Sequence, residues 1–325
     1  MDPEISRFLE NTRATTRRDI DGAGQPVAPE HVPAYTRGLV TLTGAELLQK
    51  EFPPREMILS PWLPSQGLAM IYAERGIGKT WVALNIAYAV ASAGSFLRWR
   101  APGPHTVAYV DGEMPASDLQ SRFAGIVEES PAEAPEGGLR FIAADLQPDG
   151  LPDLSDPAGQ AFYDKAISGA KLIIVDNLST VCRSLRENEA DSWGPVQAWC
   201  LRQRAAGRSV MLVHHAGKSG GQRGTSRKED VLDSVISLRR PPDYDAAQGA
   251  RFEIHFTKSR GFYGDHAAAF EARLSDGKWT TAEIARDDDE ATLRALHGQG
   301  MSVRQIAAET GLSKSAVARR LQGGA

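Results

Sequence analysis

The segment AERGIGKT places two glycines, a lysine and a threonine directly after a short apolar run. Gly76 and Gly78 let the backbone curl so that several N–H groups point inward at a phosphate, and a following helix adds the positive end of its dipole. This spacing is typical of a P-loop, in which Lys79 reaches the β and γ phosphates of ATP and the Thr80 hydroxyl ligates Mg²⁺. The alternative is an ordinary glycine turn between a strand and a helix. The predicted nucleotide-binding residues are Ala73, Glu74, Arg75, Gly76, Ile77, Gly78, Lys79, Thr80 and Trp81, of which Ala73 stands where the strict pattern has Gly.

Carboxylates follow two further apolar runs. Glu113, in the segment VDGEM, is the predicted general base that orients an attacking water, and Asp111 is a helper behind it or at the metal. The alternative is that both acids cap a helix that begins near Pro115. Asp176 ends the run LIIV, as in a Walker B strand, and is predicted to hold Mg²⁺ through a water. An apolar run that ends in Asp is common in parallel sheets, so this prediction depends on the upstream P-loop.

Two histidines lie at the end of the strand signal at 209–214, and two cationic residues lie at the end of the strand signal at 252–258. His214 or His215 could contact the γ-phosphate and report its loss to the next loop; capping or a core hydrogen bond is the alternative, and zinc is disfavoured because no Cys or acid lies at ligand spacing. Alternation directs Lys258 and Arg260 to one side of a strand. One hypothesis is that they reach a neighbouring subunit's nucleotide as an arginine finger. The alternative is a solvated strand edge.

The composition sets outer limits on these functions. A chain of 325 residues with 42% hydrophobic content can build one large α/β core with small appendages. The net charge of −4 provides no global basic field, so any nucleic-acid binding must use a local patch or ring. The charged N-terminal segment has no apolar signal region, and no apolar run reaches membrane-spanning length. We therefore expect a cytoplasmic protein without membrane contact, in which Cys182 and Cys200 are buried bystanders.

Apolar runs alternate with helical patterns from Gly67 onward, which predicts an α/β fold with a mostly parallel sheet and crossover helices. A polar, Pro-rich arm with a short helix at 43–51 precedes this region and is predicted to be partly flexible. Strand signals at 235–239, 252–258 and 268–274, without a helix between the last two, predict an antiparallel extension at one edge. The other predicted strands are 68–72, 106–111, 139–143, 172–176 and 209–214, and the predicted helices are 80–93, 116–129, 157–168 and 192–206.

Taken together, the P-loop, the DGE motif, the VDN strand and the LVHH strand resemble the RecA-fold ATPases over about residues 67–274. More narrowly, they resemble the hexameric helicases of superfamily 4 and their plasmid-replication relatives of the RepA type. The resemblance implies a homo-oligomeric, hexameric ring that hydrolyses ATP with Mg²⁺ and binds single-stranded DNA in a central channel during plasmid, phage or mobile-element replication. It places the γ-phosphate sensor best on His215, the finger pair on Lys258 and Arg260, and the channel contacts on Lys218 and Arg223. An ATP-switched DNA-binding regulator and a recombination mediator, neither of which unwinds DNA, are the alternatives.

The C-terminal residues follow the pattern of a helix-turn-helix. Gly311 supplies the positive φ of the turn and Ser313 caps the second helix. Lys314, Arg319 and Arg320 are the predicted contacts to duplex DNA, and a helical hairpin used only for packing is the alternative. We therefore divide the chain into an arm (1–60), a RecA-like ATPase domain (61–283), and a linker with the small all-α tail (284–325). The predicted apolar side of the tail consists of Ile306, Leu312, Val317 and Leu321.

Overall fold

The computed structural model describes residues 39–52, 54–184, 190–217, 226–284 and 289–310, with residues 314, 317, 318 and 321 of the tail. The chain divides into two compact units, Met1–Pro53 and Pro54–Ala325. The described part of the first unit contains helix α2 (Gly44–Gln49), which confirms the predicted short helix. Its capping box explains where it begins: the Thr43 hydroxyl accepts from the Glu46 amide, and the Glu46 carboxylate accepts from the Thr43 amide at 2.7 Å.

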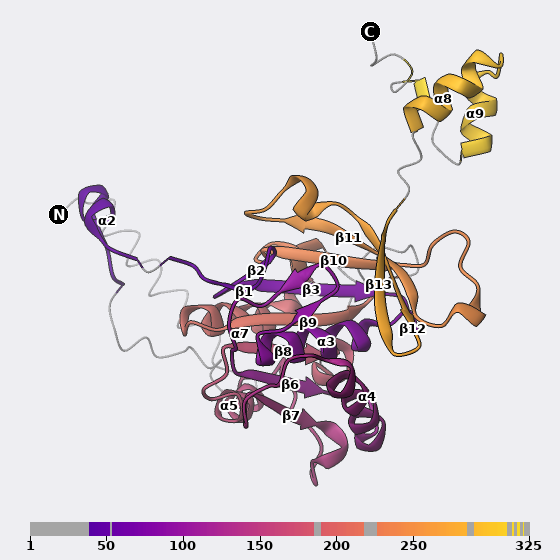
Figure 1. Ribbon diagram of the computed structural model, residues 1–325. Helices are drawn as coiled ribbons and strands as arrows, with labels where there is room; N and C mark the ends of the chain where they lie inside the picture. The colour runs from indigo at the N-terminus through magenta and orange to yellow at the C-terminus, as the bar shows by residue number, and fades with distance from the viewer. Residues whose placement is uncertain are drawn as a thin grey trace, which may run out of the picture. The chain divides into compact units, whose positions relative to one another are not determined.

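The second unit is built on a mixed sheet that has nine strands among the described residues, in the order β13-β12-β11-β10-β3-β9-β8-β6-β7 (Figure 1). The strands β10, β3, β9, β8, β6 and β7 run parallel to one another. Every residue of β3, β6, β8 and β9 is buried, which is why these strands are continuously apolar in the sequence. The six parallel strands are β3 (Leu68–Ala73), β6 (Val107–Asp111), β7 (Leu139–Ala143), β8 (Leu172–Asp176), β9 (Ser209–His215) and β10 (Ser234–Arg239).

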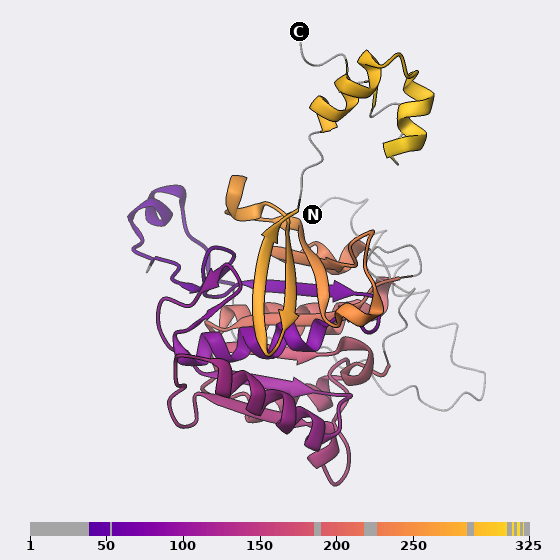
Figure 2. The same cartoon turned by 45° about the vertical axis from the view of Figure 1, so that its right-hand side comes forward.

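The predicted antiparallel extension is confirmed and has one strand more than we expected. It consists of β11 (Arg251–Ser259), β12 (Phe270–Ser275) and β13 (Lys278–Glu283), each antiparallel to its neighbour. Figure 2 shows the long β12–β13 hairpin in yellow-orange. Two small hairpins were also not predicted: β1 (Met57–Leu59) with β2 (Leu63–Pro64), and β4 (Ser95–Phe96) with β5 (Trp99–Arg100).

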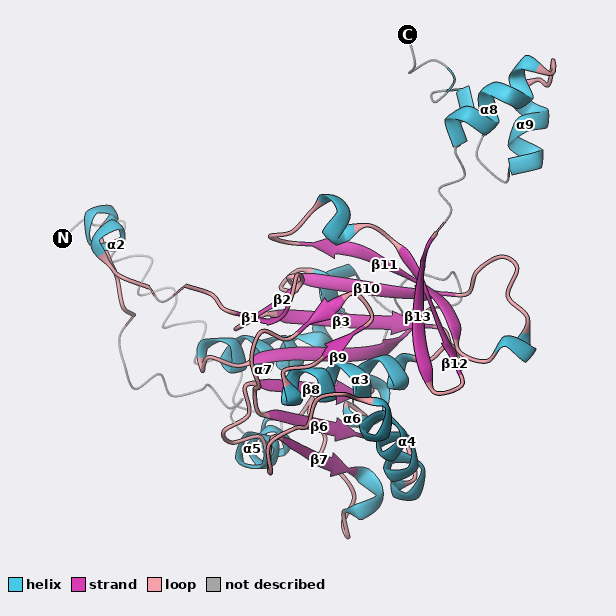
Figure 3. Cartoon of the chain, in the orientation of Figure 1, coloured by secondary structure: helices cyan, strands magenta, loops and turns pink. Residues whose placement is uncertain are grey.

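Helices cover both faces of the parallel strands (Figure 3). On one face, α3 (Lys79–Ser92) and α4 (Ala116–Glu129) pack in one hydrophobic cluster. On the other, α5 (Pro157–Ala166), α6 (Leu178–Val181) and α7 (Gly194–Ala205) pack in a second cluster, which also buries Cys182 and Cys200 as predicted. Helix α3 begins at Lys79, directly after the glycine-containing loop, and helix α4 begins shortly after the DGEM segment.

Aromatic rings join the small hairpins to the antiparallel strands. Trp62 and Trp99 meet edge to face with ring centroids 5.2 Å apart, and Trp99 meets Phe270 in the same way at 6.0 Å. All three side chains are fully buried. This packing fixes the antiparallel strands against the face of the sheet that carries α3.

The described C-terminal residues form α8 (Asp289–Gly298) and α9 (Val303–Thr310) around a small core of their own. Ile306 and Val317, two residues of the predicted apolar side, are buried in it. Lys314 is exposed in a helical segment, whereas Gly311, Leu312, Ser313, Arg319 and Arg320 lie outside the described residues, so the helix-turn-helix stays a prediction. Among the described helices, none combines the length and apolarity needed to cross a membrane.

Candidate nucleotide-binding site

The P-loop connects β3 to α3 and requires glycine at two of its positions. Gly76 has φ 77° and Gly78 has φ 126°, a backbone region that side chains disfavour. A Cβ on Gly78 would also lie 3.1 Å from the Phe252 ring. Ala73, by contrast, is the last residue of β3 and is not among the residues with positive φ. Glycine's freedom is therefore not needed there, which explains why alanine is accommodated.

Lys79 begins α3 and bends back across the loop. Its buried Nζ donates to the carbonyl oxygen of Ala73 at 3.0 Å and to that of Glu74 at 2.8 Å. Burial lowers the pKa of Lys79, while the nearby carboxylates of Asp176 and Glu113 oppose that shift. The lysine therefore sits in the centre of the loop between the strand ends that carry the acids.

The loop opens on a cavity of about 470 Å³ at the carboxyl ends of the parallel strands. Parallel α/β sheets bind ligands at this position. The structure thus brings together residues predicted from four separate segments. Of the predicted site residues, the cavity is lined by Arg75, Gly76, Gly78, Lys79, Thr80, Trp81, Asp111, Glu113, Asp176 and His215, whereas Ala73, Glu74 and Ile77 are not part of its lining.

Asp176 lies at the floor of this cavity and is 4% exposed. Its Oδ2 accepts a hydrogen bond of 2.7 Å from the Tyr109 hydroxyl, and the Thr80 side chain is a second hydrogen-bond partner. Burial raises the pKa of Asp176 to about 6, although both hydrogen bonds lower it. A carboxylate beside a threonine hydroxyl is a set of oxygen donors that suits Mg²⁺, so these residues fit the metal that the P-loop implies.

Glu113 stands at the rim, and its side chain is 62% exposed. The Asn177 side-chain amide donates to Glu113 Oε2, while Asn177 Oδ1 caps α6 by accepting from the Ser179 amide at 3.0 Å. A Cβ on Gly112 would lie 2.3 Å from the Thr180 hydroxyl, so the backbone before Glu113 lies tightly against α6. Asn177 therefore links the position of Glu113 to the end of β8.

Asp111 shapes the turn that presents Glu113. Its Oδ1 accepts from the backbone amides of Glu113 at 3.1 Å and Met114 at 2.7 Å, and burial raises its pKa. Helix α4 has no side-chain bond at its N-cap, Pro115, and the Ala116 amide bonds Asp145 instead. Neither Asp111 nor Glu113 therefore caps α4, which removes the support for the capping alternative.

The two histidines at the end of β9 point to different surroundings because successive strand residues face opposite ways. His215 lines the cavity, and its Nε2 lies 4.0 Å from Glu113 Oε2. His214 is buried, and its Nε2 lies 3.1 Å from Lys228 Nζ. The geometry places His215 rather than His214 beside the predicted base.

Lys258 and Arg260 do not join this cavity. We expected them at a strand end beside the other features, but β11 runs antiparallel to β10, and Ser259 pairs with Ser234 at the amino end of the parallel strands. Leu238, paired with Ala73, is four residues further along β10, which corresponds to about 13 Å of strand.

Local partners within the chain hold both cations. Lys258 Nζ donates to the Glu229 carbonyl oxygen, and the Arg260 guanidinium, whose side chain is 60% exposed, lies 3.8 Å from Asp233 Oδ1. The finger hypothesis therefore requires a second subunit.

The sequence did not single out Asn177 and Arg122, which line the cavity, or Tyr109, which contacts Asp176 from outside the lining. Tyr109 precedes Asp111 by two positions and so shares its strand face, and Asn177 directly follows Asp176; both signals are visible in the sequence. Arg122 on α4 lies over the Trp81 ring at 5.5 Å, one turn beyond Asp118. The predicted DNA contacts Lys218 and Arg223 lie outside the described residues.

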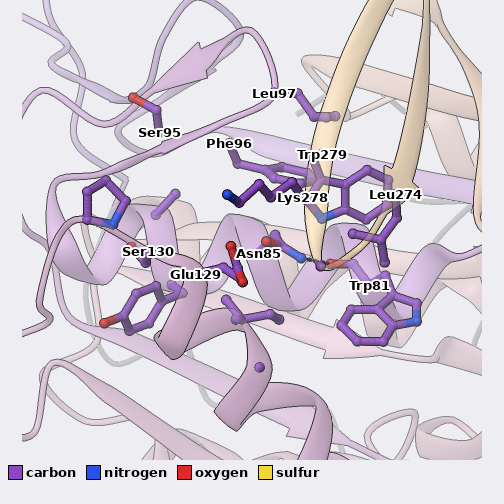
Figure 4. A pocket seen from close by; sticks show the side chains of 16 residues that line it. Trp81, Asn85, Ser95, Phe96, Leu97, Glu129, Ser130, Leu274, Lys278 and Trp279 are labelled. Atoms are coloured by element: carbon purple, nitrogen blue, oxygen red, sulfur yellow. Dashed lines mark hydrogen bonds between the residues drawn. The ribbon is translucent and has the colours of Figure 1, made fainter.

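A second cavity of about 410 Å³ adjoins the first along α3 (Figure 4). Its walls come from α3, α4, the β4 segment and the turn of the β12–β13 hairpin. Trp81 lines both cavities, and Figure 4 shows it beside Leu274, below Trp279. Trp81 therefore lies between the P-loop cavity and a second cavity whose lining includes Tyr88, Phe96 and Trp279.

Comparison with known proteins defines the class. The family model described as AAA domain matches residues 35–221, more than half of the chain, so the chain belongs to this family of P-loop NTPases. The match includes the P-loop, Glu113, Asp176 and His215 but ends before Lys258 and Arg260. No curated protein matches the chain. Among solved structures, the KaiC-like protein PH0186 from Pyrococcus horikoshii OT3 is similar, with 15% identity and a TM-score of 0.49, over 70% of this chain and 99% of that chain.

Proposed function

We propose that this protein is an ATPase of the replicative helicase type, similar to RepA, whose subunits assemble into a ring around single-stranded DNA. The observation that carries this proposal is the division of the hydrolysis groups. The predicted base Glu113 lines one cavity together with Lys79 and Thr80 of the P-loop. Lys258 and Arg260 lie instead at the amino end of the parallel strands, and Arg260 is exposed. A head-to-tail ring would bring one subunit's cations to the next subunit's cavity.

The phosphates of ATP would be held by the P-loop amides and by Lys79, and Mg²⁺ by Thr80 directly and by Asp176 through water. When bound, the metal neutralises charge on the phosphate oxygens. The protein itself holds the charged side chains of Asp176 and Lys79 in place before the nucleotide binds. Tyr109 and Thr80 hydrogen-bond the Asp176 carboxylate, and the buried start of α3 directs Lys79 into the loop.

Glu113 would accept the proton of the attacking water. Asn177 holds Oε2, so the second carboxylate oxygen is available to the water. His215 lies close enough to Glu113 to respond when the γ-phosphate leaves. From His215 the chain passes directly into Ala216, whose amide bonds the Ala73 carbonyl at 2.8 Å, and then into the loop with Lys218 and Arg223. This is the proposed path from hydrolysis to the DNA-binding loop.

The tail would recruit the ring to duplex DNA through Lys314, Arg319 and Arg320. A hexamer is the assembly that the helicase resemblance favours. An ATP-switched regulator would share the cavity but would not displace a strand, and a recombination mediator would form filaments.

The test combines ATP hydrolysis with strand displacement. Wild-type protein should hydrolyse ATP faster with single-stranded DNA and should displace an annealed strand, and Lys79→Ala should do neither. Lys218→Ala with Arg223→Ala should keep the basal ATPase but lose its stimulation by DNA. DNA-stimulated hydrolysis without displacement would overturn the helicase proposal and favour the regulator, while filaments in particle images would favour the mediator.

A further inference from the structure

The phenol of Tyr109 is placed to act on Asp176 without lining the cavity itself. Tyr109 is fully buried, and its hydroxyl donates to Asp176 Oδ2 at 2.7 Å. The two residues come from neighbouring parallel strands, because Asp111, two positions after Tyr109, pairs with Asp176. The hydrogen bond is therefore built into the register of β6 and β8.

We propose that Tyr109 is a positioning residue for the magnesium site. Its hydrogen bond fixes the orientation of the Asp176 carboxylate. This inference rests on the proposed role of Asp176 at the metal. A carboxylate on a strand end can rotate about its last side-chain bond, so a donor on one oxygen determines where the other oxygen points. The Thr80 side chain is the other partner that hydrogen-bonds Asp176. Two hydroxyl groups from different elements thus define the plane of the carboxylate.

Packing makes Tyr109 a rigid donor. It pairs with Phe141 on β7 and Ile174 on β8, and its ring centroid lies 5.6 Å from that of Phe141. Burial beside Asp176 raises the pKa of Tyr109 well above its usual range, so the hydroxyl keeps its proton. A phenylalanine at this position would preserve the ring packing and remove only the hydrogen bond.

The test is Tyr109→Phe, compared with Tyr163→Phe as the matched control. Tyr163 is also buried, and its hydroxyl donates at 2.7 Å to the Pro152 carbonyl, on the face of the sheet that carries α5. Binding of a fluorescent ATP analogue is measured in EDTA and then across a Mg²⁺ titration, and thermal unfolding verifies that each variant is folded.

Tyr109→Phe should bind the analogue as tightly as wild type in EDTA but should need about 10- to 100-fold more Mg²⁺ for the half-maximal effect, the range typical of lost outer-shell hydrogen bonds. Tyr163→Phe should follow wild type in both conditions. An unchanged Mg²⁺ requirement in folded Tyr109→Phe, or an equal loss of binding with and without Mg²⁺, would overturn the inference. A wild-type protein that does not respond to Mg²⁺ would instead contradict the proposed metal site.

Discussion

Replacing Asp176 by asparagine should stabilise the nucleotide-free protein. The pKa of Asp176 is about 6, against 3.8 for an ordinary aspartate, and one pKa unit corresponds to about 1.4 kcal/mol. The charged form therefore costs the folded state about 3 kcal/mol at neutral pH. That pKa already includes the attraction of Lys79 for the carboxylate, so we expect Asp176→Asn to raise the free energy of unfolding by up to about 3 kcal/mol.

The stability difference between wild type and Asp176→Asn should depend on pH. Because the folded pKa lies above the unfolded one, the folded wild type binds the proton more tightly, and its stability falls as pH rises from about 4 to 6. The asparagine variant lacks this titration. The difference between the two proteins should therefore be smallest near pH 4 and largest above about pH 6.

Urea unfolding in EDTA at several pH values measures the difference directly. Asp118→Asn, an exposed carboxylate on the wall of the same cavity, is the control and should change stability little at any pH. Asp176→Asn should also lose the effect of Mg²⁺ on nucleotide binding, a gain of stability at the expense of function. A variant less stable than wild type at neutral pH, or a difference that does not change with pH, would refute the reasoning.

Three further substitutions test separate parts of the account. Gly78→Ala should lower nucleotide affinity more than tenfold and destabilise the fold by about 1–3 kcal/mol, whereas Gly125→Ala, which meets open space on α4, should be neutral or stabilising in the same thermal and binding assays. Glu113→Gln should bind ATP normally but hydrolyse it at least about 100-fold more slowly, and an unchanged kcat would exclude it as the base. Asp233→Ala removes the carboxylate that accepts from Arg204 at 2.6 Å and from the Leu68 amide at 3.0 Å and should cost about 1–3 kcal/mol in denaturant unfolding, while unchanged stability would contradict this.

The parallel strands β3, β6, β8 and β9 could be predicted because burial on both faces makes each a nearly uninterrupted apolar run. Strand β13 could not be predicted, because five of its six residues are exposed and its sequence, KWTTAE, has little apolar content. The hairpin strands β4 and β5 are two residues each, too short to produce a periodic pattern. Their positions depend on the packing of Phe96 against Trp279 and of Trp99 against Phe270, rings that are distant in the sequence.

The site residues at strand ends were predictable for a related reason: parallel strands bring their carboxyl ends together whatever their order. Contacts between strands were not, because they depend on which strands are neighbours. Asn177 reaches Glu113, and Tyr109 reaches Asp176, only because β8 lies beside β6. The location of Lys258 likewise depends on β11 running antiparallel to β10, and the alternation of apolar and polar residues along a strand does not reveal its direction.

In the proposed ring, a neighbouring subunit completes each hydrolysis site, and mixing two inactive variants tests this arrangement most directly. Lys79→Ala lacks a working P-loop but keeps Arg260, and Arg260→Ala has the reverse defect. In a head-to-tail ring mixed one to one at random, about a quarter of the interfaces would combine an intact P-loop with an intact arginine. We predict that ATP hydrolysis, nearly absent in each variant alone, recovers to about that fraction of wild type on mixing. Full activity of Arg260→Ala alone, or no recovery in the mixture, would contradict the account.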